Sequence, residues 1–158
     1  RPVRQTRDAH YQHEKKGITA VLSPPLERPR AIEWIARTEK LLVATEGGDV
    51  IEVDPVFGTR TLSFSVSDPA AISVSPDKKN VVIVERGRRI VTFKISNGEQ
   101  LGEVPIQLLS DISAAWITLR SGEAVALVCG DDLSSRRVAI MSADLRRRKI
   151  ARVPTICQ

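Results

Sequence analysis

The chain has 158 residues, 42% of them hydrophobic and 27% charged, which is typical of a soluble globular domain large enough to bury a core. Its formal net charge is +5, and its longest apolar runs, such as residues 81–84, are far shorter than the ~18 residues that a membrane span requires. Cys129 and Cys157 form neither a disulfide framework nor a zinc pattern. We therefore expect a reducing, cytoplasmic environment, with no metal and no cofactor.

Residues 1–30 form a basic leader with seven Lys or Arg residues and three Asp or Glu residues. Within it, the apolar stretch 17–22 precedes two prolines and could supply the outer strand of a preceding four-stranded unit. His10 and His13 have an i, i+3 spacing, but no third ligand follows, so we expect no metal site there. The chain opens with Arg1 and has no apolar signal region, so the sequence indicates no secretory targeting. It also begins without an initiator Met, for which processing is one explanation, and we expect a piece of a longer polypeptide.

A repeat of strand-like apolar runs begins at residue 31. Each unit has four runs, and the second run recurs at offsets of 40 and then 44 residues. The runs are 31–35, 41–44, 50–53 and 61–64, then 71–75, 81–84, 90–93 and 100–104, then 115–119, 125–128, 138–141 and 149–153. Four strands in roughly 40–45 residues is the pattern of a β-propeller blade. The sequence therefore predicts an all-β, partial β-propeller of about three four-stranded antiparallel blades.

Turn residues separate the runs where hairpins are expected. Asn97-Gly98 lies between two runs, and both of its residues readily take the positive φ that a tight hairpin requires. Glycines also separate the second and third runs of the first two units. The resulting division is a leader at 1–30, blades at 31–68, 69–110 and 111–154, and a tail at 155–158.

Two stretches keep a helical alternative open. Apolar residues fall at helical spacing across 105–118, and again across 139–150 around the basic run 146–149. The three-unit repeat assigns both stretches to strands and connections, which favours the all-β prediction.

Residues 71–84, Ala-Ile-Ser-Val-Ser-Pro-Asp-Lys-Lys-Asn-Val-Val-Ile-Val, resemble the first two strands of WD-repeat and related bacterial propeller blades. In those blades an apolar strand is followed by Ser-Pro-Asp-Gly-Lys and a second apolar strand. The resemblance covers about residues 31–154 and implies the fold without a function. The strict Gly-His and Trp-Asp signatures are missing, and Val53-Asp54 is the nearest match, so a generic propeller blade is the closer description.

An incomplete ring has consequences for assembly. Propellers typically close with about four to eight blades, and each blade buries its apolar faces against its neighbours. We therefore expect the ring to be completed by further blades of the same parent or by another chain. For the same reason we expect the isolated chain to associate with itself or with the rest of its parent.

Charged residues gather in the loops that join second and third strands, which share one end of a propeller with the connections between blades. The candidate partner-binding residues there are Arg86, Arg88, Arg89, Asp131, Asp132, Arg136 and Arg137. The loop of the third unit is expected to be the longest, because the offset grows from 44 to 48 residues across it. We expect a protein partner with a mixed, net acidic surface. Nucleic acid is less favoured because aromatic residues make up only 4% of the chain, and solvated loop charges are the alternative.

Patterns of enzymatic chemistry are not found. The sequence contains no nucleophile elbow, phosphate loop or dinucleotide fingerprint. Asp131 and Asp132, taken with Asp111, lack the alternating oxygen spacing of a calcium loop. Glu33 is the only charged residue in the three first runs, so an interaction scaffold is favoured over a fragment of a hydrolase or lactonase-like propeller enzyme.

The two tryptophans lie in first runs of the repeat. Trp34 belongs to the first unit and Trp116 to the third. We expect both indole rings in the core rather than on a ligand-binding surface.

Overall fold

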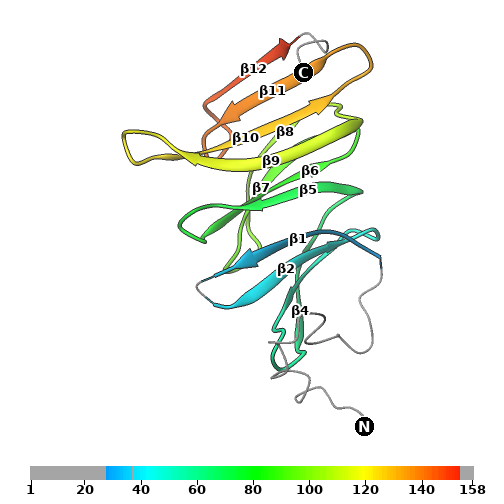
Figure 1. Ribbon diagram of the computed structural model, residues 1–158, viewed down its shortest axis with the longest axis vertical. Helices are drawn as coiled ribbons and strands as arrows, with labels where there is room; N and C mark the ends of the chain where they lie inside the picture. Colours follow the sequence, from blue (N-terminus) through cyan, green and yellow to red (C-terminus); the bar gives the residue numbers. More distant parts are fainter. Residues whose placement is uncertain (1–27, 37, 154–158) are drawn as a thin grey trace, which may run out of the picture.

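The computed structural model describes residues 28–36 and 38–153 (Figure 1). The strand expected at 17–22, the two histidines of the leader, Cys157 and the tail 155–158 lie outside the described residues. Within them, the chain forms β-strands and no helix, and so no helix long and apolar enough to cross a membrane. The all-β prediction is confirmed, and the helical alternatives for 105–118 and 139–150 are wrong.

Three four-stranded antiparallel sheets follow one another along the chain, and in each sheet consecutive strands are hydrogen-bonded neighbours. The first sheet contains β1 (Pro29–Ile35), β2 (Lys40–Thr45), β3 (Asp49–Val53) and β4 (Arg60–Ser65). The second contains β5 (Pro69–Val74), β6 (Asn80–Glu85), β7 (Arg89–Lys94) and β8 (Gln100–Pro105). The third contains β9 (Ser110–Thr118), β10 (Ala124–Asp131), β11 (Arg136–Met141) and β12 (Arg148–Val153).

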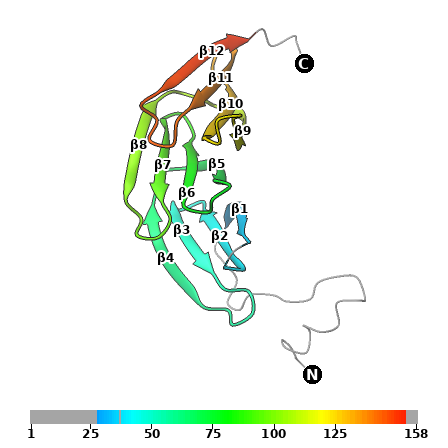
Figure 2. The same cartoon turned by 90° about the vertical axis from the view of Figure 1, so that its left-hand side faces the viewer.

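The sheets stack face to face along a curve. Figure 2 shows the first strand of each sheet on the concave side of this curve and the fourth strand on the convex side. β1 contacts β5, and β5 contacts β9, so the inner strands hold the stack together. This arrangement is a partial propeller, as the sequence predicted.

The middle sheet is covered on both faces, which explains why its strands are almost continuously apolar. Successive side chains of a strand point to opposite faces. Val81 and Ile83 pack in a cluster with the first sheet, whereas Val82 and Val84 pack in a cluster with the third, and all four are fully buried.

Two specific contacts join neighbouring sheets. The rings of Phe64 and Phe93 are stacked with centroids 4.2 Å apart, which connects the first sheet to the second. Trp116 Nε1 donates a hydrogen bond of 2.9 Å to the carbonyl oxygen of Ser73, which connects the inner strands of the second and third sheets. Trp116 is half-buried against the core, in accord with its expected place.

Trp34 corrects the prediction that both tryptophans lie in the core. Its side chain is 45% exposed. Ala31 and Ile35 of the same strand pack toward the second sheet, so Trp34 lies on the opposite face of the first sheet. That face has no neighbouring sheet among the described residues, and the repeat position that is buried in the middle sheet is therefore exposed here.

The repeat of the third sheet differs by one residue from the sequence alignment. Val81 pairs with Val74 in the second sheet, and Ala124 pairs with Thr118 in the third, so the equivalent of Val81 is Ala124 at an offset of 43 residues rather than Val125 at 44. Five residues, 119–123, separate the paired Thr118 and Ala124, one fewer than the six residues, 75–80, that separate the paired Val74 and Val81. Because successive side chains of a strand point to opposite faces, this one-residue difference changes which side chains of β10 face the second sheet, relative to the alignment made from the sequence. Ala126 and Val128 are the ones that face it.

The long loop expected in the third unit is instead an extended hairpin. Beyond the point at which the second sheet turns, three more cross-strand pairs form between β10 and β11, namely Cys129–Val138, Gly130–Arg137 and Asp131–Arg136. The turn itself covers only 132–135, one residue more than 86–88 in the second sheet. Most of the extra length is therefore paired strand.

Candidate partner-binding end

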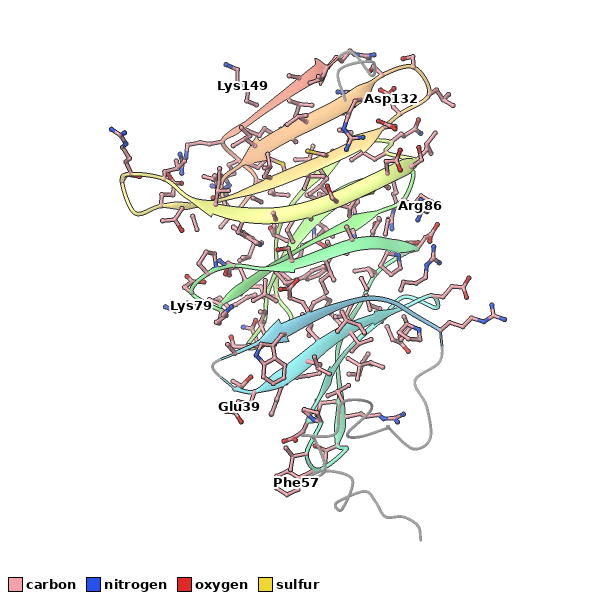
Figure 3. All side chains as sticks on the ribbon, in the orientation of Figure 1. Glu39, Phe57, Lys79, Arg86, Asp132 and Lys149 are labelled. Carbon is pink, nitrogen blue, oxygen red and sulfur yellow. The ribbon has the colours of Figure 1, made fainter. Side chains whose placement is uncertain are left out.

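The turns that join second to third strands lie at one end of the stack, together with the connections between sheets. Figure 3 shows Arg86 and Asp132 on this side, and Lys79 and Glu39 on the opposite side. We call this surface the arginine end. It contains the residues singled out from the sequence, Arg86, Arg88, Arg89, Asp131, Asp132, Arg136 and Arg137.

A fully buried carboxylate organises the arginine end. Glu85, the last residue of β6, accepts hydrogen bonds from Arg89 Nε at 2.7 Å and Arg88 Nη1 at 3.2 Å on Oε1, and from the Ser67 backbone N–H at 2.9 Å on Oε2. Arg89 also forms an ion pair with Glu103. Burial raises the pKa of Glu85, but the hydrogen bonds from Arg89 and Ser67 and the nearby guanidinium charges hold it below its ordinary value. Arg88 and Arg89 thus hold the fold together at this end.

Arg86 connects three segments. Its Nη1 donates to the carbonyl oxygen of Leu109 at 2.8 Å, and its Nε lies 3.7 Å from a carboxylate oxygen of Asp68. Its backbone N–H also donates to the carbonyl oxygen of Asp68. The connections before and after the second sheet are therefore fastened to the β6–β7 turn.

Asp132 closes the β10–β11 turn. Its Oδ1 accepts the backbone N–H groups of Ser134 and Ser135, both at 2.8 Å, and its Oδ2 lies 3.2 Å from Arg137 Nη1. These hydrogen bonds hold the pKa of Asp132 well below its usual range. The carboxylate is therefore engaged in the local structure.

The neighbouring aspartate is engaged as well. Asp131 Oδ1 lies 3.0 Å from Arg136 Nη1, and the two residues are directly opposite each other in the hairpin. Asp111 lies near the start of β9. Among the described residues, no group of three His, Cys, Asp or Glu side chains could hold a metal ion.

A groove of about 340 Å³ opens at the arginine end between the second and third sheets. Its lining combines apolar and cationic side chains: Pro105, Ile106, Gln107, Leu109, Asp132, Leu133, Ser134, Arg137 and Arg152. Leu133 is 90% exposed, and Arg137 Nε is buried with no hydrogen-bond partner. The groove can therefore take an apolar side chain beside a carboxylate.

Sequence reasoning missed three residues that shape this end: Glu85, Leu109 and Arg152. A signal for Glu85 was present, because Glu85 and Arg89 flank a short turn and are directly opposite in β6 and β7. Opposite charges in directly opposed positions are a common stabilising pair in antiparallel sheets. Leu109 and Arg152 come from other parts of the chain, and no local pattern indicates them.

Comparison with known proteins places the fold. No family model and no curated protein matches the chain. Solved structures are similar to it, and three of them illustrate the likeness. The β-propeller domain of Cps50 (Swd1) from Myceliophteria thermophila is 11% identical with a TM-score of 0.61, over 82% of this chain and 40% of that one. The WD40 domain of Toxoplasma gondii coronin is 14% identical with a TM-score of 0.64, over 82% and 35%. U3-55K is 12% identical with a TM-score of 0.65, over 85% and 41%.

The chain therefore spans about two-fifths or less of the length of each of these structures. At such low identity the likeness concerns the fold alone. Three four-stranded antiparallel sheets that superimpose on part of a WD40 propeller show that the chain has the fold of a partial β-propeller, with blades similar to those of WD40 propellers.

Proposed function

We propose that the chain is a segment of a protein–protein interaction scaffold, a propeller whose ring is completed by further blades or by another chain. Its units are the blades 31–68, 69–110 and 111–154. The observation that carries this proposal is the exposure of repeat positions that are buried in the middle sheet. Ile32 is 57% exposed, whereas its equivalent in the second sheet, Ile72, is 8% exposed against the first.

The outer face of the third sheet also exposes a repeat position that is buried in the middle sheet. Ile140 pairs with Leu127 as Ile90 pairs with Val84. Ile90 is fully buried in the cluster shared with the third sheet, whereas Ile140 is 43% exposed. The two open faces of the stack are thus the two halves of the junction that already joins the sheets, and each suits another blade.

Association of the 158-residue chain tests this part of the proposal. Light scattering over a concentration series should show self-association, because the open faces are apolar. Ile32→Lys and Ile140→Lys should reduce it. Leu133→Lys is the matched control, since Leu133 is exposed outside both faces. A chain that stays monomeric at every concentration would contradict the proposal.

We infer that the arginine end is the surface that contacts a partner. The groove supports this, because it presents exposed Leu133 beside Arg137 and Arg152. The partner surface that fits is mixed and net acidic, with an apolar side chain next to a carboxylate. Nucleic acid fits less well, because the described residues that line the groove include no aromatic side chain on which a base could stack.

The test uses charge reversals that spare the buried carboxylate. Arg88 and Arg89 are unsuitable, because reversing them would leave Glu85 buried beside a like charge. Arg86→Glu and Arg152→Glu should weaken capture of partner proteins by the chain, by under about 1 kcal/mol for a rim contact and by more for a desolvated one. Arg146→Glu at the opposite end is the control, and the comparison is made at two salt concentrations. Equal recovery for all variants would contradict the assignment.

No observation favours the alternative of a propeller-enzyme fragment. The hydrogen bond that joins the inner strands β5 and β9 runs from the Trp116 indole to the backbone carbonyl oxygen of Ser73. It is a structural contact between sheets and not a nucleophile–base pair.

A further inference from the structure

A second groove lies at the end opposite the arginine end, between the first and second sheets. Its volume is about 450 Å³. We call it the lysine groove, and it is lined by Ile35, Thr38, Glu52, Lys78, Lys79, Lys94, Ile95 and Ser96. Figure 3 shows Lys79 on this side of the molecule, away from Arg86 and Asp132.

The lysines stand on a backbone that is held by hydrogen bonds. The Lys78 N–H donates to the carbonyl oxygen of Ser75 at 2.9 Å, and the Lys79 N–H donates to Asp77 Oδ1 at 3.0 Å. The carbonyl oxygen of Lys79 in turn accepts the Ile95 N–H at 2.9 Å, which ties the β5–β6 turn to the β7–β8 turn. The backbone that carries Lys78 and Lys79 is therefore held in place before any ligand arrives.

The charge of these lysines is poorly neutralised. Among the described residues, Lys78 and Lys79 have no carboxylate within 4 Å, and Lys94 is only within 3.9 Å of Glu99. Among the described residues that line the groove, Glu52 is the one carboxylate, against three lysines.

Two longer-range interactions reach these lysines without closing an ion pair. Burial raises the pKa of Glu33, and the charge of Lys78 opposes that shift. The carboxylate of Asp77 accepts the Ser75 hydroxyl at 2.6 Å and interacts electrostatically with Lys79. Neither carboxylate lines the groove, so both lysines remain open to an added anion.

The arginine end shows the opposite condition. Each arginine of that groove or its flanking turns has a carboxylate within 4 Å: Arg86, Arg88, Arg89, Arg136, Arg137 and Arg152. Among the described cations that line the two grooves, Lys78 and Lys79 are therefore the ones without a carboxylate within 4 Å.

We propose that the lysine groove binds an acidic peptide segment of a protein partner. Carboxylates of the peptide would contact Lys78, Lys79 and Lys94, and an apolar side chain between them would lie against Ile35 and Ile95. The apolar floor favours a peptide over a small inorganic anion. The described residues of the lining include no aromatic side chain, which disfavours single-stranded nucleic acid, because it is commonly held by base stacking. This site goes beyond the proposed function, since it lies at the other end of the stack and takes a different partner segment.

The probe is the labelled peptide acetyl-Glu-Glu-Leu-Glu-Glu-amide, followed by fluorescence anisotropy with the whole chain. Saturable binding is expected, weakening as salt is raised, and the Gln-Gln-Leu-Gln-Gln peptide should not bind. Lys79→Gln and Lys94→Gln should each weaken binding about two- to fivefold, the effect of one exposed ion pair. Lys149→Gln on β12 is the matched control and should leave binding unchanged.

Several results would overturn the proposal. Equal affinity for the acidic and neutral peptides, or equal losses for Lys79→Gln and Lys149→Gln, would show that the groove is not the site. Displacement of the peptide by millimolar inorganic phosphate would show a general anion site, and tighter binding of an oligothymidylate would show a nucleic-acid surface. Arg86→Glu should not affect this peptide, so a failure here is distinguishable from a failure at the arginine end.

Discussion

Replacing Glu85 by glutamine should lower the free energy of unfolding by about 3 kcal/mol. Glu85 is fully buried, and its two oxygens accept four hydrogen bonds, three from the guanidinium groups of Arg88 and Arg89 and one from Ser67. Glutamine keeps the shape but turns an N–H group toward these donors. Losing one partner of a buried pair costs about 3–5 kcal/mol, and the lower end applies because Arg89 is 15% exposed and keeps Glu103.

Urea unfolding followed by circular dichroism measures this effect. With a slope of about 2 kcal/mol per M, the midpoint should fall by about 1.5 M. Glu103→Gln is the control, and because Glu103 is 49% exposed it should cost less than about 1 kcal/mol. Equal midpoints for the two variants would refute the role given to Glu85.

The pH dependence supplies an independent check. The pKa of Glu85 lies below its ordinary value of 4.5, so its contribution is present above pH 4.5 and is lost as the pH falls through the lowered value. The wild-type chain should therefore lose more stability in acid than Glu85→Gln does. Parallel pH profiles for the two proteins would contradict this account.

Three further predictions follow from contacts between and within the sheets. Gly102→Ala should destabilise the chain by about 1–3 kcal/mol in urea unfolding, because the added Cβ would overlap the backbone carbonyl oxygen of Asp144. Trp116→Phe should cost about 1 kcal/mol in the same assay, since it removes the bond to the carbonyl oxygen of Ser73. Burial raises the pKa of Glu33, so its ionisation weakens the fold as the pH rises above 4.5; Glu33→Gln should be more stable than wild type at pH 7, by less than about 1 kcal/mol, and should match it below pH 4.

The architecture could be predicted because each strand carries its own apolar run. Residues 81–84, for example, are apolar at every position, which suits a strand covered on both faces in the middle of the stack. A local run reports burial well, because burial of apolar surface is the dominant driving force for folding. An apolar run does not predict how far the strand continues beyond the run at either end. β9 therefore begins at Ser110, five residues before the run expected at 115–119.

The register of the third sheet shows a second limit. Ala124 and Val125 are both apolar, so hydrophobicity alone aligns either residue with Val81 of the second unit. The choice depends on the turn at 119–123, where the Leu119 N–H bonds the carbonyl oxygen of Glu123. One residue fewer in that turn changes the face of every side chain on β10.

The charged end shows a third limit, which concerns function directly. A cluster of arginines in the sequence predicts a binding surface only if these arginines do not form ion pairs with carboxylates of the same chain. Glu85 and Asp131 could be matched to their arginines from the hairpin pattern, because the partners are directly opposite in the pairing. The bond from Arg86 to Leu109 crosses between sheets, and no local pattern predicts it.

The two ends of the stack therefore differ in what their cations can do. Guanidinium groups offer several hydrogen-bond donors in a fixed geometry. At the arginine end these donors bind the buried carboxylate of Glu85, the carboxylates of the turns and the carbonyl oxygen of Leu109. Exposed lysine ammonium groups on turns contribute little to stability, and among the described residues Lys78 and Lys79 have no carboxylate within 4 Å. Substitutions should thus separate the two ends by readout. Changes at Glu85 or Arg89 should appear first in the free energy of unfolding, whereas changes at the lysines should leave unfolding unaltered and appear only in binding of an acidic segment.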